Sequence, residues 1–158
     1  MEFELVKDFK KKVFDDLHGV YASAFNKSLL QILTKDDFKD FFDMGAKIYL
    51  LKKDYNIIGY IVASINREIA EIFSIGISMP HQKKGYGKIL LDRLVKSNSN
   101  ILKITLEVSE LNYQAIKFYK TYGFSLIATR KNYYLIRKGI NINSWNWSIT
   151  IICINTLI

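Results

Sequence analysis

Hydrophobic positions along the chain follow two periods, and the shorter period predicts strands. Apolar residues alternate with polar ones, or form short continuous runs, in four segments: 47–52, 57–64, 71–78 and 101–108. Polar turns at 53–56 and 66–68 separate the first three, the third of which starts near Ile69, so we expect three consecutive antiparallel strands. The short apolar run 3–6 predicts a first edge strand.

Apolar residues at helical spacing predict helices between these strands. Asp8 is placed to cap a first helix, and Thr34-Lys35-Asp36-Asp37 resembles a capping box that starts a second. Two further helices are expected over 88–96 and 112–119, the last one ended by Gly123. Strands and helices in this segregated order predict an α+β (mixed α/β) fold in which helices pack on a sheet.

The C-terminal part is harder to interpret. Trp145, Trp147 and Ile149 alternate with polar residues, which favours one more strand. Whether 152–158 belongs to the fold stays open. Cys153 lies in an apolar run without an activating neighbour in sequence, so we expect a buried, inert thiol.

Composition narrows the class of protein. The 158 residues suffice for one domain, which we expect to span 1–158, and the single proline and 49% hydrophobic content are typical of a globular chain. A single cysteine excludes an internal disulfide and fits a reducing compartment. No apolar run approaches the ~20 residues of a membrane span, and the acidic start Met1–Glu4 does not resemble a signal peptide. We therefore expect a cytoplasmic protein without a membrane partner.

The candidate chemistry begins where the strand 71–78 ends. Pro80 closes the strand, and Gln82-Lys83-Lys84-Gly85-Tyr86-Gly87 leads directly into a helix. Backbone N–H groups at a helix start have no partner within the helix, and the helix dipole there favours negative charge. Gly85 and Gly87 would let a ligand approach the backbone closely. The segment therefore predicts a phosphate-binding turn.

The spacing differs from two common nucleotide motifs and resembles a third. Ile89 replaces the hydroxyl residue of a P-loop, and Leu90 replaces the last glycine of a dinucleotide-binding motif. Gln-x-x-Gly-x-Gly between strand and helix resembles the pyrophosphate-binding motif of the GCN5-related N-acetyltransferase (GNAT) superfamily. Leu106-Glu107-Val108, the segment 112–124 and Arg130-Lys131-Asn132-Tyr133-Tyr134 are similar to its RimI-type ribosomal-protein-alanine N-acetyltransferase branch. The resemblance is specific from Glu71 to Tyr134.

This resemblance implies a GNAT fold, with a central, mostly antiparallel twisted sheet and helices on both faces. It implies acetyl-CoA as cosubstrate, no metal, and direct attack in a ternary complex by the N-terminal α-amine of a protein, with a ribosomal protein that begins with alanine as the expected partner. The implied coenzyme-binding residues are Ile75, Gly76, Ile77, Gln82, Lys83, Lys84, Gly85, Tyr86, Gly87, Lys88 and Asn112.

The resemblance implies two catalytic residues. Glu107, at the end of its strand, matches the general base of the family, and Tyr119, two helical turns beyond Asn112, would protonate the leaving thiolate. An α-amine, with a pKa near ~8, costs about 3 kcal/mol less to neutralise than a lysine amine near ~10.4, so a carboxylate base suits an α-amine better. Without the surrounding motif, Glu107 would be a surface glutamate and Tyr119 a core aromatic.

Other functions stay open at this point. One alternative is an acetyltransferase for a small amine, and another is an acyl-CoA-binding module without turnover. The net charge of +8 also suggests nucleic acid. The lysines are spread along the chain, in pairs and triplets such as Lys52-Lys53 and Lys10-Lys11-Lys12, and no block of five or more like charges occurs. This favours a solvated basic surface, and we expect no direct contact with nucleic acid. The acceptor and the oligomeric state do not follow from the sequence.

Overall fold

The computed structural model describes residues 1–25, 33–109, 112–130 and 146–152. Two compact units emerge, unit 1 (Met1–Ile65 and Phe73–Ser99) and unit 2 (Asn66–Ile72 and Asn100–Ile158). The elements in chain order are β1 (Glu2–Leu5), α1 (Lys11–Ala24), α2 (Lys35–Asp43), β2 (Lys47–Lys53), β3 (Asn56–Asn66), β4 (Ile69–Ile77), the 3₁₀ turn Met79–His81, α3 (Tyr86–Ser97), β5 (Lys103–Ser109), α4 (Tyr113–Tyr122), β6 (Ser125–Arg130) and β7 (Asn146–Ile152). The α+β class predicted from the sequence is confirmed.

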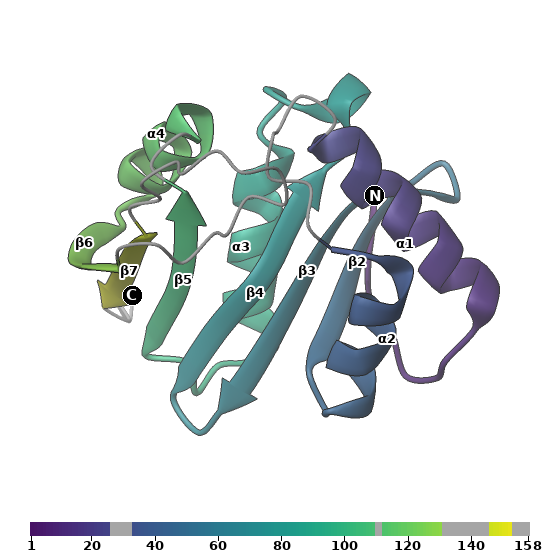
Figure 1. Cartoon of the computed structure of the whole chain (residues 1–158), viewed down its shortest axis with the longest axis horizontal. Coiled ribbons are helices and arrows are strands. Elements are labelled where there is room, and N and C mark those ends of the chain that lie inside the picture. Colours follow the sequence, from purple (N-terminus) through teal and green to yellow (C-terminus); the bar gives the residue numbers. More distant parts are fainter. Residues whose placement is uncertain (26–32, 110–111, 131–145, 153–158) are drawn as a thin grey trace, which may run out of the picture. The chain divides into compact units, whose positions relative to one another are not determined.

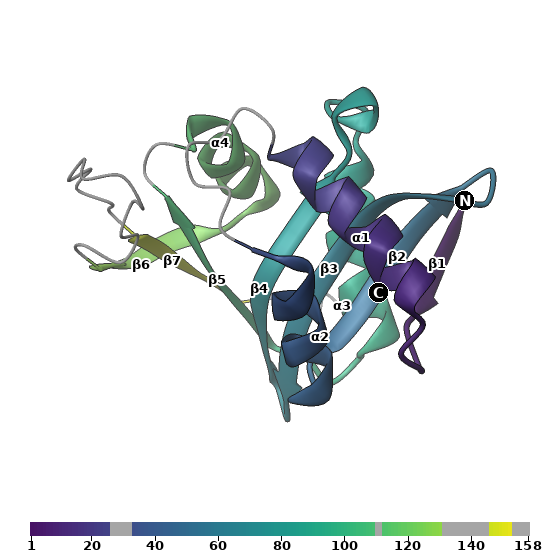
Figure 2. The same ribbon diagram turned by 45° about the vertical axis from the view of Figure 1, so that its right-hand side comes forward.

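Unit 1 is a sheet covered on both faces. Its strands lie in the order β1-β2-β3-β4. β1 and β2 are antiparallel, as are β2 and β3, and β3 and β4 run in opposite directions in Figure 1. Helices α1 and α2 cover one face of this sheet, and α3 covers the other, as Figures 1 and 2 both show. The predicted run of antiparallel strands with helices on both faces is therefore confirmed.

The two-sided cover explains the continuous apolar runs of the central strands. Ile48–Leu51 and Ile58–Ala63 are buried at every position, whereas a sheet with one wet face would alternate buried and exposed side chains. The ring of Phe38, from α2, meets the ring of Tyr60, from β3, edge to face at 5.6 Å between centroids. Both side chains are fully buried, so they join the helical layer to the sheet.

The helix starts agree with the sequence in one case and differ in the other. Thr34 and Asp37 form the predicted capping box of α2, because the Asp37 N–H donates to the Thr34 hydroxyl and the Thr34 N–H donates to the Asp37 carboxylate. The expectation for Asp8 is wrong. Helix α1 begins at Lys11 after Lys10, which makes no side-chain cap, because the chain between Asp8 and Lys10 is still not helical.

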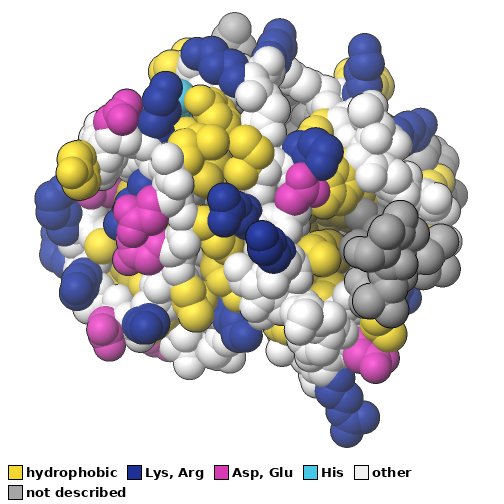
Figure 3. All heavy atoms as spheres, turned by 180° about the vertical axis from the view of Figure 1, so that it is seen from behind, with side chains coloured by type: hydrophobic (Ala, Val, Ile, Leu, Met, Phe, Trp, Pro, Cys, Tyr) yellow, Lys and Arg dark blue, Asp and Glu magenta, His cyan; other side chains and the backbone are white. Residues whose placement is uncertain are grey.

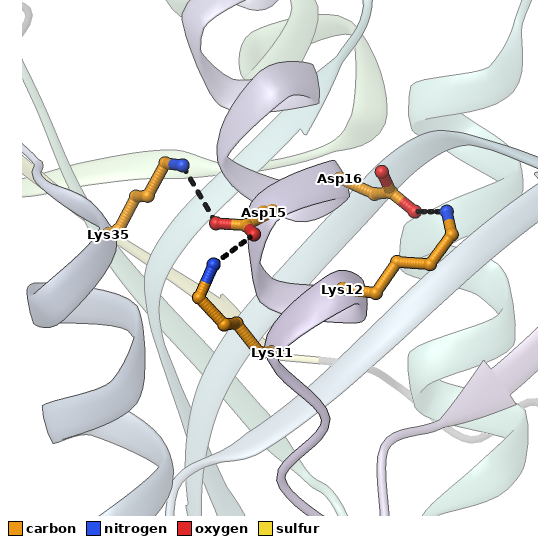
Figure 4. Close-up of polar contacts among 5 residues, drawn as sticks. All are labelled: Lys11, Lys12, Asp15, Asp16 and Lys35. Atoms are coloured by element: carbon orange, nitrogen blue, oxygen red, sulfur yellow. Dashed lines mark hydrogen bonds and ion pairs between the residues drawn. The ribbon is translucent and has the colours of Figure 1, made fainter.

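One surface ion pair, between Lys35 and Asp15, joins α1 to α2, and two more lie within α1 (Figure 4). Asp15 accepts hydrogen bonds from Lys35 at 2.7 Å and from Lys11 at 3.1 Å, and Lys12 pairs with Asp16 at 2.9 Å. The hydrogen bonds from Lys35 and then Lys11 lower the pKa of the Asp15 carboxyl from its ordinary value. Their contribution to stability is therefore present at neutral pH and is lost as the pH falls through the lowered pKa.

Unit 2 contains the first part of β4, the strands β5, β7 and β6, which follow it in that order in the sheet, and helix α4. Ile69–Ile72, the first part of β4, pairs in parallel with Lys103–Leu106 of β5, and β7 runs antiparallel to both β5 and β6. β7 confirms the strand predicted around Trp147. Gly123 ends α4 with φ +111°, as expected. Cys153 and the segment 153–158 lie outside the described residues.

Two surface properties bear on the function classes. Lysine and arginine side chains are spread over the face that carries α3, with acidic side chains between them, as Figure 3 shows. Within the described ranges, no helix has the length and apolar character to cross a membrane.

The capping box of α2 yields the first testable prediction. Thr34→Ala removes the acceptor for the Asp37 N–H, and we expect the free energy of unfolding to fall by about 1 kcal/mol, measured by denaturant titration. Thr121→Ala is the matched control, since the Thr121 hydroxyl only donates to the Lys117 carbonyl within α4. An equal loss in both variants would contradict a specific role of the cap.

Candidate functional site

The candidate site of unit 1 begins where β4 ends, and Ser78 fixes this end. The N–H and the hydroxyl of Ser78 both donate to the carbonyl of Ile58 in β3, at 2.9 and 3.1 Å. Nδ1 of His81 lies 3.0 Å from the same hydroxyl. Pro80 lies within the 3₁₀ turn Met79–His81 that follows. The strand end is thus tied to β3 before the chain turns toward α3.

Residues 83–88, the glycine turn, take the chain into α3. Lys83 and Gly85 have φ values of +59° and +82°, a left-handed backbone that glycine adopts with least strain. Gly85 is the N-cap of α3, and the Ile89 N–H donates to its carbonyl at 3.2 Å as the first bond of the helix. The amides before Ile89 therefore point out of the N-terminal end of the helix, where the dipole favours an anion.

The helix begins at Tyr86, two residues before the predicted start. The reason is that the left-handed Gly85 already completes the turn, so Tyr86 and Gly87 are the first helical residues rather than part of a loop. Among the lysines of the glycine turn, Lys84 donates to the Pro80 carbonyl at 2.9 Å and Lys88 pairs with Asp92 at 2.5 Å. Lys84 is thus held beside the turn by a backbone carbonyl, whereas the Asp92 carboxylate offsets the charge of Lys88.

Gln82 comes directly before the glycine turn. Its side-chain nitrogen, Nε2, donates to the carbonyl of Ile77 at 3.0 Å and to that of Ala24 at 3.3 Å. These two carbonyls belong to the last residue of β4 and the last residue of α1.

Two glycines, Gly59 on β3 and Gly76 on β4, leave room for side chains of the neighbouring strand beside the predicted pantetheine segment Ile75–Ile77. A Cβ on buried Gly76 would lie 2.7 Å from Cε1 of Tyr60, and one on Gly59 would lie 2.4 Å from Cδ1 of Ile77. The Tyr60 hydroxyl lies 2.7 Å from Oγ of Ser74, a buried hydrogen bond. Gly59 and Tyr60 were not predicted from the sequence as neighbours of this segment. A glycine inside an apolar strand is the signal that would have found Gly59.

Unit 2 holds the other predicted residues. Glu107 lies on β5 opposite Ser148 of β7, and its side chain is half-buried, with Oε2 inside. The side-chain oxygen of Asn112 accepts from the Ala115 N–H at 3.1 Å, so Asn112 caps α4. Tyr119 is buried, with its ring centroid 5.2 Å from both the Phe118 and Phe124 rings.

The structure thus brings the predicted residues together in two groups. Ile75–Ile77 and 82–88 lie in unit 1 around the end of β4, and Glu107, Asn112 and Tyr119 lie in unit 2 on β5 and α4. In the described part of the chain, no three His, Cys, Asp or Glu side chains gather in the manner of a metal site.

The order of strand, left-handed glycine and helix start coincides with a family match. The sequence profile of the Acetyltransferase (GNAT) family matches residues 12–124, which include all the predicted site residues. The chain belongs to this family. It is therefore an N-acetyltransferase that uses acetyl-CoA as its cosubstrate, and the predicted family, fold, enzyme class and cosubstrate are confirmed.

Individual members of the family agree with this assignment. The [ribosomal protein bS18]-alanine N-acetyltransferase of Haemophilus ducreyi is 33% identical over 106 residues, which cover 65% of this chain and 73% of that one. The crystal structure of the ribosomal-protein-S18-alanine N-acetyltransferase from Escherichia coli has a TM-score of 0.77 at 17% identity and covers 95% of this chain and 93% of its own. A GNAT acetyltransferase from Elizabethkingia anophelis, solved with acetyl-CoA bound, has a TM-score of 0.70 at 18% identity and covers 94% and 97%. At these identities the two solved structures show the fold.

The backbone at Gly85 yields the second prediction. Gly85→Ala forces a left-handed backbone on a residue with a Cβ, so we expect the free energy of unfolding to fall by about 1–2 kcal/mol in denaturant titration. Among the residues that the structure describes, no heavy atom beyond the chain neighbours lies within 4 Å of the added Cβ, so the effect isolates the backbone.

Gly19→Ala is the control with the opposite sign. Gly19 lies inside α1, where an added Cβ also meets open space. Because alanine favours a helix over glycine, this variant should gain roughly 0.5–1 kcal/mol. Stabilisation by Gly85→Ala would contradict the assigned backbone.

Proposed function

We propose that the protein acetylates the N-terminal α-amine of a ribosomal protein that begins with alanine, by direct attack on acetyl-CoA in a ternary complex. The observation that carries the proposal is the 33% identity with the Haemophilus ducreyi enzyme over 106 residues. For the location we propose the cytoplasm, where a ribosomal protein is synthesised.

For acetyl-CoA we propose binding through the backbone of unit 1. Amides of the glycine turn would hold the diphosphate. The first amides of α3 point out of the N-terminal end of the helix, which supports this proposal. The main chain of Ile75–Ile77 would pair with the pantetheine arm, as an added strand does. β4 pairs with β5 through Ile69–Ile72, so the segment assigned to pantetheine lies farther along the same strand. An N–H near Ile77 would then serve as the donor to the thioester oxygen.

For the base we propose Glu107, acting directly or through a water. The acceptor amine arrives protonated and has to lose a proton before it attacks the thioester carbon. The half-buried position of Glu107 on β5 supports this role, because packing around the carboxylate limits the directions from which an amine or a water can reach it. Asn112, already the cap of α4, is proposed to bond the pantetheine amides with its remaining amide hydrogens.

For the acid we propose Tyr119. The departing thiolate of coenzyme A has a conjugate acid near ~8.5, and a phenol near ~10 transfers a proton to it at a cost of about 2 kcal/mol. The ring is fixed between Phe118 and Phe124, which supports the role by holding the hydroxyl in one direction. The same packing makes Tyr119 a core residue, so one side chain would serve both purposes.

The proposed base makes a prediction about pH. Glu107→Gln should lower kcat for an alanine-starting peptide at pH 7 by roughly 10²- to 10⁴-fold, because the amide cannot accept the proton. The loss should shrink as the pH rises above ~8, where the α-amine is already neutral. Glu71→Gln, on an exposed position of β4, is the matched control and should leave the rate unchanged. An unchanged rate in Glu107→Gln at pH 7 would contradict the assignment of Glu107 as the base.

The acceptor is tested by comparing three substrates at equal concentration. We expect acetylation, followed by mass spectrometry, on a peptide that begins with alanine. The same peptide with a blocked N-terminus and an internal lysine should react at least tenfold more slowly, because the lysine amine is protonated more strongly. Faster turnover of polyamines would favour a small-molecule acetyltransferase, and acetyl-CoA binding without any turnover would favour a binding module.

A further inference from the structure

Three residues, Ser78, Met79 and Gln82, hold the short segment between β4 and the glycine turn by hydrogen bonds. Ser78 is bonded to Ile58 of β3, and the Met79 N–H donates to Oγ of Ser23 in α1 at 3.0 Å. Gln82 adds the bonds of Nε2 to Ala24 and Ile77. The last turn of α1 is thus joined twice to the segment that leads into the glycine turn.

The orientation of the Gln82 amide follows from chemistry. The two oxygens that face it are backbone carbonyls, which only accept hydrogen bonds, so the nitrogen and not the oxygen of the amide has to face them. Both hydrogens of Nε2 are then used within the protein. The carbonyl of Ala24 is one of those at the C-terminal end of a helix that lack a helical partner, and Gln82 supplies a donor to it across a sequence separation of 58 residues.

The position of Gln82 makes this tie relevant to coenzyme binding. Lys83, with φ +59°, follows at once, and Gly85, with φ +82°, follows two residues later. Gln82 is therefore the residue from which the backbone of the glycine turn starts, and its position sets the direction of that turn. A shift there would displace the amides before Ile89, on which the proposed diphosphate contact depends.

We infer that Gln82 is a positioning residue, which holds the glycine turn against the C-terminal end of α1 and thereby sets the affinity for acetyl-CoA. The sequence resemblance assigned Gln82 to the coenzyme itself, whereas its side-chain donors are directed to Ile77 and Ala24. Ser23 supports the same junction from α1. This inference rests on the proposed coenzyme site in unit 1.

The main test is Gln82→Met, which keeps the length of the side chain and removes both donors. We expect a roughly tenfold weaker acetyl-CoA affinity in titration calorimetry, because the two part-buried carbonyls lose their partner and water replaces it incompletely. The KM for acetyl-CoA should rise by the same factor, with kcat at saturation and the KM for the acceptor peptide changed less than twofold. A merely structural defect would lower stability without producing this division between the constants.

Ser23→Ala separates positioning from direct contact. Because Ser23 belongs to α1 and binds only the Met79 amide among the contacts described here, a direct contact between Gln82 and the diphosphate predicts no effect of Ser23→Ala on affinity. Positioning predicts a loss of roughly threefold, and a double variant whose loss is smaller than the product of the two single losses. The double variant matters because two ties to one junction are not independent.

The outcomes distinguish the inference from the function it rests on. Gln114→Met, at an exposed position of α4, is the matched control and should bind acetyl-CoA as the wild type does. Wild-type affinity in either Gln82→Met or Ser23→Ala would overturn the positioning role while leaving the coenzyme site intact. A wild-type protein that fails to bind acetyl-CoA would instead overturn the proposed site. If Gln82→Met does not fold, Ser23→Ala alone decides, since an unchanged affinity in it contradicts the inference.

Discussion

The path of the backbone from Ile77 to Gly85 is the constraint on which the candidate site of unit 1 depends. Over this stretch the chain leaves a strand, passes through a 3₁₀ turn and enters a helix with two left-handed residues on the way. Such a path is costly for an isolated chain, and the surrounding structure stabilises it by hydrogen bonds. Ser78 bonds to β3, and Met79 and Gln82 bond to α1. A ligand that contacts the amides at the start of α3 therefore contacts a surface that two other elements, β3 and α1, hold in place.

Side chains that pack over two glycines join β3 to β4 in the same region. Gly59 and Gly76 leave no room for a Cβ, and the Tyr60 ring fills the space against Gly76. Tyr60 is fully buried and meets Phe38 of α2, so the contact links the helical layer to the strand that we assign to pantetheine. Local stability and the proposed binding of the cosubstrate thus depend on the same few side chains.

Membership of the GNAT family establishes the acetyl-CoA chemistry, and the acceptor is a separate question. The family match ends at Phe124, and the similarity to the alanine N-acetyltransferase of Haemophilus ducreyi covers 65% of the chain. The proposed preference for an α-amine has a physical basis beyond this similarity. A carboxylate base removes a proton from an α-amine at a lower free-energy cost than from a lysine amine, because the pKa of the α-amine is lower. The proposed roles of Glu107 and Tyr119 both belong to unit 2, so they are tested separately from the coenzyme turn.

Local sequence patterns were enough to predict most of the elements, the fold class and the family. Strand and helix periods, the capping box at Thr34 and the stop at Gly123 depend on residues close together in the chain, which is why they were predictable. The motif 82–87 was recognisable because its residues are contiguous and Gly85 has a local backbone requirement, a left-handed φ. The start of α1 was missed because Asp8 precedes a non-helical segment that no local pattern revealed. The contacts of Gln82, Gly59 and Tyr60 became visible only in the tertiary structure. Their partners lie far along the chain or on a neighbouring strand, and they come close only when the sheet and its helices pack together.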